Sequence, residues 1–430
     1  MRIILVTPGS GDTFYCENCL RDATLARAFL RRGCEMLLVP MYLPTGMFDG
    51  IQTRKSELFF GGINVYLQQK LGIFRKTPRW IDKWLDSPGL LERVKRRANM
   101  TNASLLGQMT VSMLRGEDGR QVKEVRRLVE WLAEPENRAD VVVLSNLLLG
   151  GLAGPIKRRL GIPVVCMLQD EQGFIDGLGR PWSGQAWELA AGLCGDIEMF
   201  ISVSDYYKGQ MAGRLSLPPQ RIEVVHTGIE TGCYSAASQR PAAPTIGFLG
   251  RMCYDNGLDI LLAAAHILSM DERLGNLQVW ICGGKTSGDD LFMRKMRRRI
   301  RFRKLDGRVK FFDDFGLESR CEFLRGLSVL SAPGRQPAAY GLNVIEAMAC
   351  GVGFVGPEGG VFRELAGLTG GGVLYEHNTP VRLADALRPI LLDAEKAGEL
   401  GVRGREAALR YFDIEQSAER MVSLFERPGK

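Results

Sequence analysis

An arginine that follows a predicted strand at a glycine turn is the first group in the sequence suited to charge chemistry. Arg251 comes directly after the apolar run 245–250. A guanidinium in that position can donate paired hydrogen bonds to a diphosphate and stabilise the negative charge of a leaving group. The alternative is a surface arginine held in an ordinary ion pair. The sequence alone leaves both interpretations open.

A second candidate lies in the segment 340–346, which reads YGLNVIE. We expect Glu346 to open a helix that ends at 349. A carboxylate there can accept both hydrogens of a ribose cis-diol, while backbone amides bind the phosphates; the amides in question are those of Gly341, Leu342 and Asn343. The helix dipole also favours acidic residues in a first turn, so plain capping is the alternative.

Four glycine-rich turns follow predicted strands, at 8–11, 250–251, 283–284 and 359–360. Such turns let backbone amides approach a phosphate closely. The first contains Gly11 and the third Gly283. The first departs from the Gly-x-Gly-x-x-Gly fingerprint after its second glycine. Because any single turn can exist without a ligand, the prediction depends on the four together.

Apolar runs of strand length alternate with helical patterns along almost the whole chain. In the first half we predict strands at 2–8, 35–42, 141–144, 163–168 and 199–203, and helices at 12–32, 120–134, 150–160 and 183–193. In the second half we predict strands at 245–250, 277–283, 309–312, 328–332 and 353–356, and helices at 258–270, 289–305, 318–324 and 342–349. Alternation of this kind indicates parallel sheets covered on both faces.

The length of 430 residues indicates two domains, because a single core rarely grows beyond about 250–300 residues. The small, proline-rich segment 236–244 is typical of a linker. We expect a first domain over 1–225 and a second over 226–404, with a C-terminal helix from about 405 to 430 that packs back on the first. The space between two such domains is the expected ligand site.

Composition and charge narrow the possible localisation, partners and chemistry of the protein. No export signal and no run of about 18 apolar residues is present, so we expect a cytoplasmic protein whose ten cysteines are reduced. The net charge of +7 permits an anionic partner, such as a nucleotide or a lipid surface, without requiring one. Three histidines, far apart in sequence, argue against a histidine-based triad.

Two basic stretches stand out. Residues 74–97 interleave basic side chains with tryptophans and leucines, which suits either a lipid headgroup interface or a helix packed on the first domain. Both interpretations stay open, and the hypothesis is that this stretch docks the protein on an anionic membrane. The stretch 294–310 is interpreted as a solvated helix face. It has no interleaved aromatics beyond Phe302, so nucleic acid is not an expected partner.

With these motifs in place, the chain resembles the GT-B glycosyltransferases of family 4 over nearly its whole length. The most specific block is 340–351, followed by 359–365. Weaker blocks are 25–39, 201–204, 224–229 and 257–262. Three further stretches, at 15–22, 59–69 and 168–171, resemble a bacterial branch of that family.

The resemblance implies an α/β GT-B fold, in which two Rossmann-like doubly wound domains face each other across a cleft. It implies a retaining transfer from a nucleotide-diphosphosugar without a metal or other cofactor. The sequence does not identify the acceptor, for which a lipid-linked molecule and a polysaccharide are the candidates. The second domain would bind the donor and the first the acceptor. The candidate catalytic residues are Arg251, Gln169 and Asp170. The candidate donor-binding residues are Gly11, Arg251, Asn256, Gly283, Tyr340, Gly341, Leu342, Asn343 and Glu346.

Three positions depart from the family pattern. Asn256 stands where the family usually carries a lysine, Ala338 where it has a first glutamate, and Gln169 where a histidine often ends the strand. Losing the lysine removes a charge-assisted contact, on the order of 1.5–3 kcal/mol. Either other side chains substitute, the candidates being Arg335, Asp170 and Glu171, or the protein is a catalytically impaired homologue that binds a nucleotide or sugar.

Overall fold

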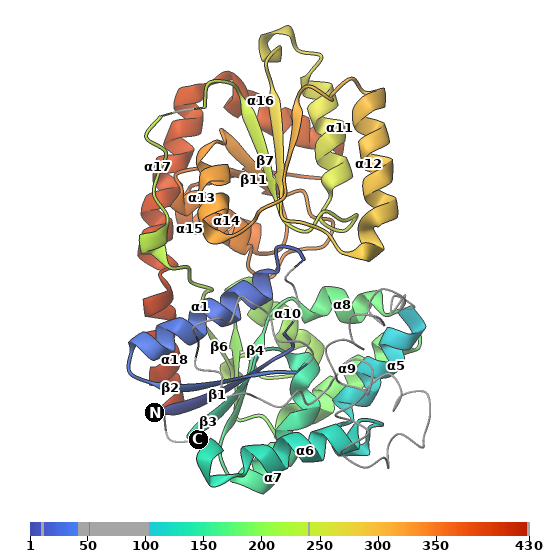
Figure 1. The fold of residues 1–430 in the computed structure, drawn as a ribbon, viewed down its shortest axis with the longest axis vertical. Helices are drawn as coiled ribbons and strands as arrows, with labels where there is room; N and C mark the ends of the chain where they lie inside the picture. The colour runs from blue at the N-terminus through green and yellow to red at the C-terminus, as the bar shows by residue number, and fades with distance from the viewer. Residues whose placement is uncertain (10–12, 42–50, 52–102, 240, 428–430) are drawn as a thin grey trace.

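The computed structural model describes residues 1–9, 13–41, 51, 103–239 and 241–427. Figure 1 shows two α/β domains stacked along the long axis, each built on a parallel six-stranded sheet with helices on both faces. The strand orders are β2-β1-β3-β4-β5-β6 and β12-β11-β10-β7-β8-β9. The predicted fold, two Rossmann-like domains of the GT-B type, is therefore confirmed.

The first sheet forms from short, almost wholly apolar runs, as expected for parallel strands buried on both faces. Leu5 of β1 lies opposite Leu38 of β2 on one side and Val143 of β3 on the other, and all three are buried. Its strands are β1 (Arg2–Thr7), β2 (Glu35–Pro40), β3 (Val141–Leu144), β4 (Val164–Leu168), β5 (Met199–Ser202) and β6 (Ile222–Val224).

The helices of the first domain are α1 (Glu17–Arg31), α5 (Ala103–Leu114), α6 (Val122–Leu132), α7 (Ala153–Leu160), α8 (Glu171–Gly177), α9 (Trp182–Gly192) and α10 (Asp205–Leu215). The predicted start of the first helix at residue 12 is wrong, because α1 begins at Glu17. Tyr15 gives its amide to the carbonyl of Gly283 in the second domain, at 2.7 Å, instead of to a helical turn. Phe14, Tyr15 and Cys16, directly before α1, are therefore not helical.

The second sheet agrees closely with the sequence prediction, and β9 has the predicted bounds. Its strands are β7 (Thr245–Leu249), β8 (Gln278–Cys282), β9 (Val309–Phe312), β10 (Val329–Ser331), β11 (Phe354–Pro357) and β12 (Gly372–Tyr375). Its helices are α11 (Leu258–Leu268), α12 (Asp290–Phe302), α13 (Leu317–Arg325), α14 (Leu342–Ala349), α15 (Val361–Thr369) and α16 (Pro380–Leu392).

The C-terminal part differs from the single helix expected from about 405. It forms α17 (Ala394–Tyr411) and α18 (Ile414–Phe425), separated by a break at which Asp413 caps α18. Helix α17 packs on α14 and α15 of the second domain, whereas α18 packs on α1 of the first, where the rings of Phe29 and Phe425 lie 6.2 Å apart (Figure 1). The chain thus returns to the first domain at this break.

The carboxyl ends of the two sheets meet at the junction between the domains. The chain after β1 reaches the end of β8, through the bond from Tyr15 to Gly283. Ser204, just after β5, donates to the carbonyl of Ala339 in the loop that follows β10, at 2.6 Å. Loops that follow strands of such sheets carry ligand-binding groups, so the junction is where a site is expected.

In the part of the chain that the structure describes, no helix is both long and apolar enough to cross a membrane. The basic and aromatic stretch 74–97 lies outside the described residues. Its docking on an anionic membrane therefore stays a prediction.

Candidate functional site

The start of helix α14 is the centre of the candidate site. Gly341 precedes it with a φ of +65°, a left-handed conformation that glycine adopts without strain. The side-chain amide of Asn343 donates to the carbonyl of Leu249 at the end of β7, at 2.8 Å. Its oxygen accepts from the amide of Val344, also at 2.8 Å. Asn343 thus fixes the first turn of α14 beside the loop that carries Arg251.

Glu346 lies in the second turn of α14, because the helix begins at Leu342. Its expected place at the helix start, and with it the capping alternative, are wrong. The side chain is 1% exposed. It accepts hydrogen bonds from the hydroxyls of Tyr15 (2.7 Å) and Tyr234 (2.5 Å) and from Arg320 (2.9 Å). In this conformation both carboxylate oxygens are occupied by protein groups instead of a ribose.

Arg251 is held in an ion pair, which was the alternative to a free phosphate-binding guanidinium. Its Nε and Nη2 donate to Asp289 at 2.8 and 3.0 Å, and Nη2 also donates to Thr286 at 3.0 Å. Burial lowers the pKa of Arg251, but the bond to Asp289 outweighs it and leaves the pKa above its usual value. The side chain remains 38% exposed, so Asp289 orients a guanidinium that is still accessible.

Three other residues of the second domain support the loop around Arg251. Asn256 donates to the carbonyl of Arg251 at 2.9 Å, which holds the turn closed. Gly283 has a φ of +125°, and a Cβ there would lie 2.5 Å from the carbonyl oxygen of Gly250. Arg335, an expected substitute for the missing lysine, is instead bound by Asp259 through two bonds of 2.9 and 2.8 Å.

The remaining predicted positions on this side have structural contacts. The hydroxyl of Tyr340 donates to Asn18 of α1. The carbonyl of Ala338 accepts from the amide of Val361 at 2.9 Å, so this position supports the start of α15. Gly11 lies outside the described residues.

On the first-domain side, Gln169 and Glu171 belong to a buried network. Gln169 is 1% exposed and donates to the carbonyl of Ser145 at 2.6 Å. Glu171 accepts from the amides of Leu147 (2.9 Å) and Gln169 (2.7 Å) and from the hydroxyl of Tyr207 (2.8 Å). Glu171 is therefore engaged in holding the turn after β4, which does not fit its expected role as a catalytic substitute.

Asp170, between these two, behaves differently. It has a φ of +55°, which is uncommon for a residue with a side chain, and it precedes α8. Its side chain reaches solvent, but the protein packed around the carboxyl desolvates it, and this desolvation, together with the charge of Glu171, raises the pKa of Asp170 to about 7. Asp170 also contributes to the raised pKa of Tyr340 from the second domain. It is the acid of this turn that faces the junction.

A short stretch before and at the start of α1, which we call the docking segment (residues 13–18), brings the second-domain groups into one site. The ring of Phe14 lies 5.5 Å from the guanidinium carbon of Arg251. The hydroxyl of Tyr15 reaches Glu346. The carboxyl of Glu17 accepts from the amide of Leu342 at 3.3 Å. Because these contacts come from three residues within a stretch of four, Arg251, the start of α14 and Glu346 line a single site.

Sequence reasoning missed four of the residues in this site: Tyr15, Glu17, Tyr234 and Arg320. A tyrosine or arginine on a helix or loop gives no signal of its own. Tyr15 and Glu17 do fall in the block 15–22, which carried part of the resemblance. That block was the available signal, and it pointed to the docking segment without assigning it a function.

A hollow of about 240 Å³ lies beside this site, between α1 and the second domain. Its walls include Arg27 of α1 and, across the junction, Phe315, Arg320 and Glu346. Side chains of α1 and α13 form part of the walls of this hollow, and Glu346 also lines it. A ligand group could thus reach this region if the contacts of Glu346 changed.

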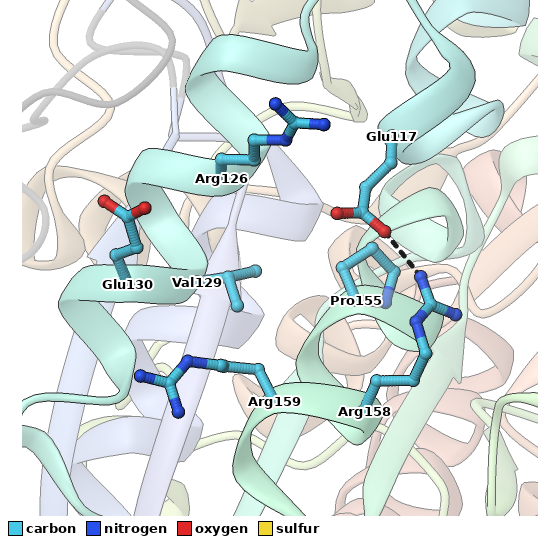
Figure 2. A pocket seen from close by; sticks show the side chains of 7 residues that line it. All are labelled: Glu117, Arg126, Val129, Glu130, Pro155, Arg158 and Arg159. Atoms are coloured by element: carbon cyan, nitrogen blue, oxygen red, sulfur yellow. Dashed lines mark hydrogen bonds and ion pairs between the residues drawn. The ribbon is translucent and has the colours of Figure 1, made fainter.

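A second hollow, of about 280 Å³, lies far from the junction, between α6 and α7 (Figure 2). Three arginines and two glutamates line it, and Arg158 donates to Glu117 at 2.6 Å. Figure 1 places α6 and α7 at the end of the first domain away from the second. This hollow therefore does not share in the candidate site.

The described residues contain one group with the composition of a metal site: Asp205, His226 and Glu364, whose ligand atoms lie within 4.8 Å of one another. Glu364 accepts from the amides of Asp205 (3.2 Å) and Tyr206 (2.8 Å) and pairs with His226 at 2.7 Å. These bonds lower the pKa of Glu364 although burial opposes them. The carboxylate of Glu364, from the second domain, thus caps the start of α10 in the first domain, and this contact joins the two domains.

Solved structures that share this two-domain arrangement include GT-B glycosyltransferases. The Anabaena protein HepE in complex with UDP and glucose superposes with a TM-score of 0.70 at 14% identity, over 100% of both chains. Sucrose-phosphate synthase from Thermosynechococcus elongatus has a TM-score of 0.70 at 15% identity, over 99% of this chain and 98% of the other. At such identities the likeness establishes the fold.

Sequence comparison identifies the family. A family model described as glycosyl transferases group 1 matches residues 243–393, and one described as glycosyltransferase family 4 matches residues 107–232. Together these matches cover more than half of the chain. The chain belongs to the family 4 glycosyltransferases, as its motifs predicted.

Two relatives show how distant the similarity is. An alpha-maltose-1-phosphate synthase of Mycolicibacterium smegmatis is 25% identical over 67% of this chain and 79% of its own length. A D-inositol 3-phosphate glycosyltransferase of a Nocardioides species is 25% identical over 76% of this chain and 73% of its own. The second of these relatives is named as a glycosyltransferase, in agreement with the family.

Proposed function

We propose that the protein transfers a sugar from a nucleotide-diphosphosugar to an acceptor, with retention of configuration and without a bound metal. One observation carries the proposal: the amide of Leu342 at the start of α14 donates to an oxygen acceptor from across the junction, here the carboxyl of Glu17. Helix N-termini favour anions because their amides are unpaired and the dipole is positive there. A donor diphosphate is the anion that a family 4 glycosyltransferase would place at such a position.

The chemistry requires positive charge where the bond between the sugar and the diphosphate breaks. Arg251 and the amides at the start of α14 would stabilise the negative charge that develops on the leaving diphosphate. Glu346 would bind the ribose hydroxyls once its tyrosine partners give way. The helix end and the guanidinium are the groups that would serve in place of a metal ion.

On the first-domain side, Asp170 is the candidate to contact the sugar or the acceptor hydroxyl. A pKa of about 7 lets this carboxyl exchange a proton near neutral pH, which suits acid–base chemistry. Gln169 would act indirectly, by fixing the turn that presents Asp170. The acceptor proposed is a lipid-linked sugar or a polysaccharide, bound by the first domain.

The experiment is a thermal-shift panel of UDP-, GDP- and ADP-sugars in the presence of EDTA. A ligand at 100 times its Kd stabilises the folded protein by about 2.7 kcal/mol, which a melting curve resolves. Any donor that binds is then incubated with candidate acceptors, and the anomeric configuration of the product is read by NMR. Binding without turnover would favour the catalytically impaired homologue, and the absence of stabilisation by every donor would contradict both.

A further inference from the structure

The docking segment contacts each group that the proposed function assigns to the donor. Phe14 forms an antiparallel bridge with Gly284, and the amide of Tyr15 donates to Gly283 at 2.7 Å. Further along, Asn18 accepts from the hydroxyl of Tyr340. These bonds fix the segment, which belongs to the first domain, across the open end of the second sheet.

The chemical groups that the segment presents resemble those of a nucleotide-diphosphosugar. The carboxyl of Glu17 occupies the amide end of α14, where the diphosphate is expected. The hydroxyl of Tyr15 lies on Glu346, as a ribose hydroxyl would. The ring of Phe14 lies against Arg251. One short stretch of chain thus covers the phosphate position, the ribose position and the cation together.

We propose that the docking segment is an internal competitor of the donor, so that the donor binds only when residues 13–18 withdraw from the second domain. This inference rests on the proposed function, because it concerns regulation of that same site. It makes the occupied state of the junction the resting state of the protein.

The contact made by Glu17 is of a kind that a diphosphate can displace. Its hydrogen bond to Leu342 is long, at 3.3 Å. Burial, with a smaller contribution from the charges of Asp170 and Glu346, outweighs the bonds from the amides of α14 and raises the pKa of Glu17 to about 8. Near neutral pH the group is therefore mostly a neutral acid, which interacts with the helix dipole more weakly than an anion does.

The first test compares Glu17→Ala with Glu17→Gln, and the probes are UDP, GDP and ADP, measured by calorimetry at pH 7. Alanine removes the group that holds the amide of Leu342, so the nucleotide that binds best should bind about three- to tenfold more tightly. Glutamine keeps an acceptor oxygen and should bind within about twofold of the wild type. Weaker or unchanged binding in Glu17→Ala would overturn the proposal.

The second test needs no variant. Hydrogen exchange at the amide of Tyr15, which is protected by Gly283, is followed in the wild-type protein with and without saturating nucleotide. Withdrawal predicts faster exchange when the nucleotide is bound, and slower or equal exchange would overturn the proposal. Should none of the three nucleotides bind to the wild type or to Glu17→Ala, the proposed function fails as well. Binding to both, with no gain in the variant and no faster exchange, overturns the inference alone.

Discussion

The two faces of the interdomain junction use polar side chains in opposite ways. On the first-domain face, Gln169 and Glu171 bond inward, to the backbone of their own domain. On the second-domain face, Glu346 and the amide of Leu342 bond outward, to the docking segment of the other domain. The difference teaches that two acidic residues, each found in a sequence motif of the family, need not share a function. Changes on the first face should cost stability, whereas changes on the second should alter ligand binding.

The largest effect is expected from Glu171→Ala. The substitution leaves two buried amides and the hydroxyl of Tyr207 without their acceptor, at about 1–3 kcal/mol for each buried unsatisfied group. The free energy of unfolding, measured by urea denaturation, should fall by about 3–5 kcal/mol. The control is Asp170→Asn, because asparagine tolerates the left-handed backbone there and should be close to wild type. A loss below about 1 kcal/mol in Glu171→Ala would break the comparison at its first face.

Arg251→Ala should show the opposite behaviour. Binding of a nucleoside diphosphate should weaken by about 1.5–3 kcal/mol, roughly 10- to 150-fold, because a charge-assisted contact to phosphate is lost. The apo protein should lose no more than about 1 kcal/mol of stability, since the ion pair with Asp289 is partly exposed.

Arg335→Ala provides the matched control for this change. Arg335 is also paired with an aspartate, Asp259, but it makes no contact with the docking segment in the described structure. Calorimetry with UDP, GDP and ADP should therefore give an unchanged affinity for Arg335→Ala. An equal loss in the two variants would show that Arg251 acts through general charge and not through its position beside α14.

A smaller gain is expected from Asn256→Lys, which restores the cation that the family usually carries. The new ammonium would lie in the turn that holds Arg251, and it should tighten nucleotide binding by about 1 kcal/mol, roughly fivefold, at low salt. The gain should shrink as salt is added. Asn276→Lys is the control, because it adds the same charge before β8, at the opposite end of the sheet. Equal gains from the two lysines would contradict a specific role for position 256.

The fold could be predicted from the sequence because its signals are local. Helix α14 has the predicted bounds, since Gly341 supplies the left-handed turn before it and the apolar residues after it follow a helical period. Strand β9 also has the bounds predicted from the sequence. The C-terminal break at Asp413 was missed, although an aspartate two residues before a glutamate is a recognisable cap once the break is known.

The site could be predicted only in part, because its partners come from distant parts of the chain. Glu346 was identified from its motif, but its three partners, Tyr15, Tyr234 and Arg320, come from a loop of the first domain, a turn before the linker and helix α13. No local pattern relates them. The start of α1 was placed too early for the same reason, since a contact with the other domain replaces a helical turn that the pattern alone favours.

The last effect expected is a dependence of the free energy of unfolding on pH, caused by the carboxyl of Glu17. Its pKa is about 8 in the folded protein, above the usual 4.5 of an unfolded glutamate, so the folded state binds the extra proton between these values. Stability from this group is therefore present at low pH and is lost as the pH rises from about 4.5 through 8. The neighbouring acids Asp170 and Glu346 are present in both the wild type and Glu17→Gln. Their own titration therefore cancels to first order when the two proteins are compared.

Glu17→Gln cannot lose a proton, so its free energy of unfolding should fall less than that of the wild type as the pH rises. Urea denaturation at pH 5, 7 and 9 should show the two proteins diverging progressively as the pH rises, the glutamine variant being the more stable at pH 9. Parallel curves would mean that the carboxyl of Glu17 is solvated and does not sit at the amide end of α14. Divergence in the opposite direction would require a positively charged neighbour for Glu17. In that case a fixed cation would already lie at the start of α14, where the phosphate is expected. The contrast with Asp170, the acid on the first-domain face, would then be sharper.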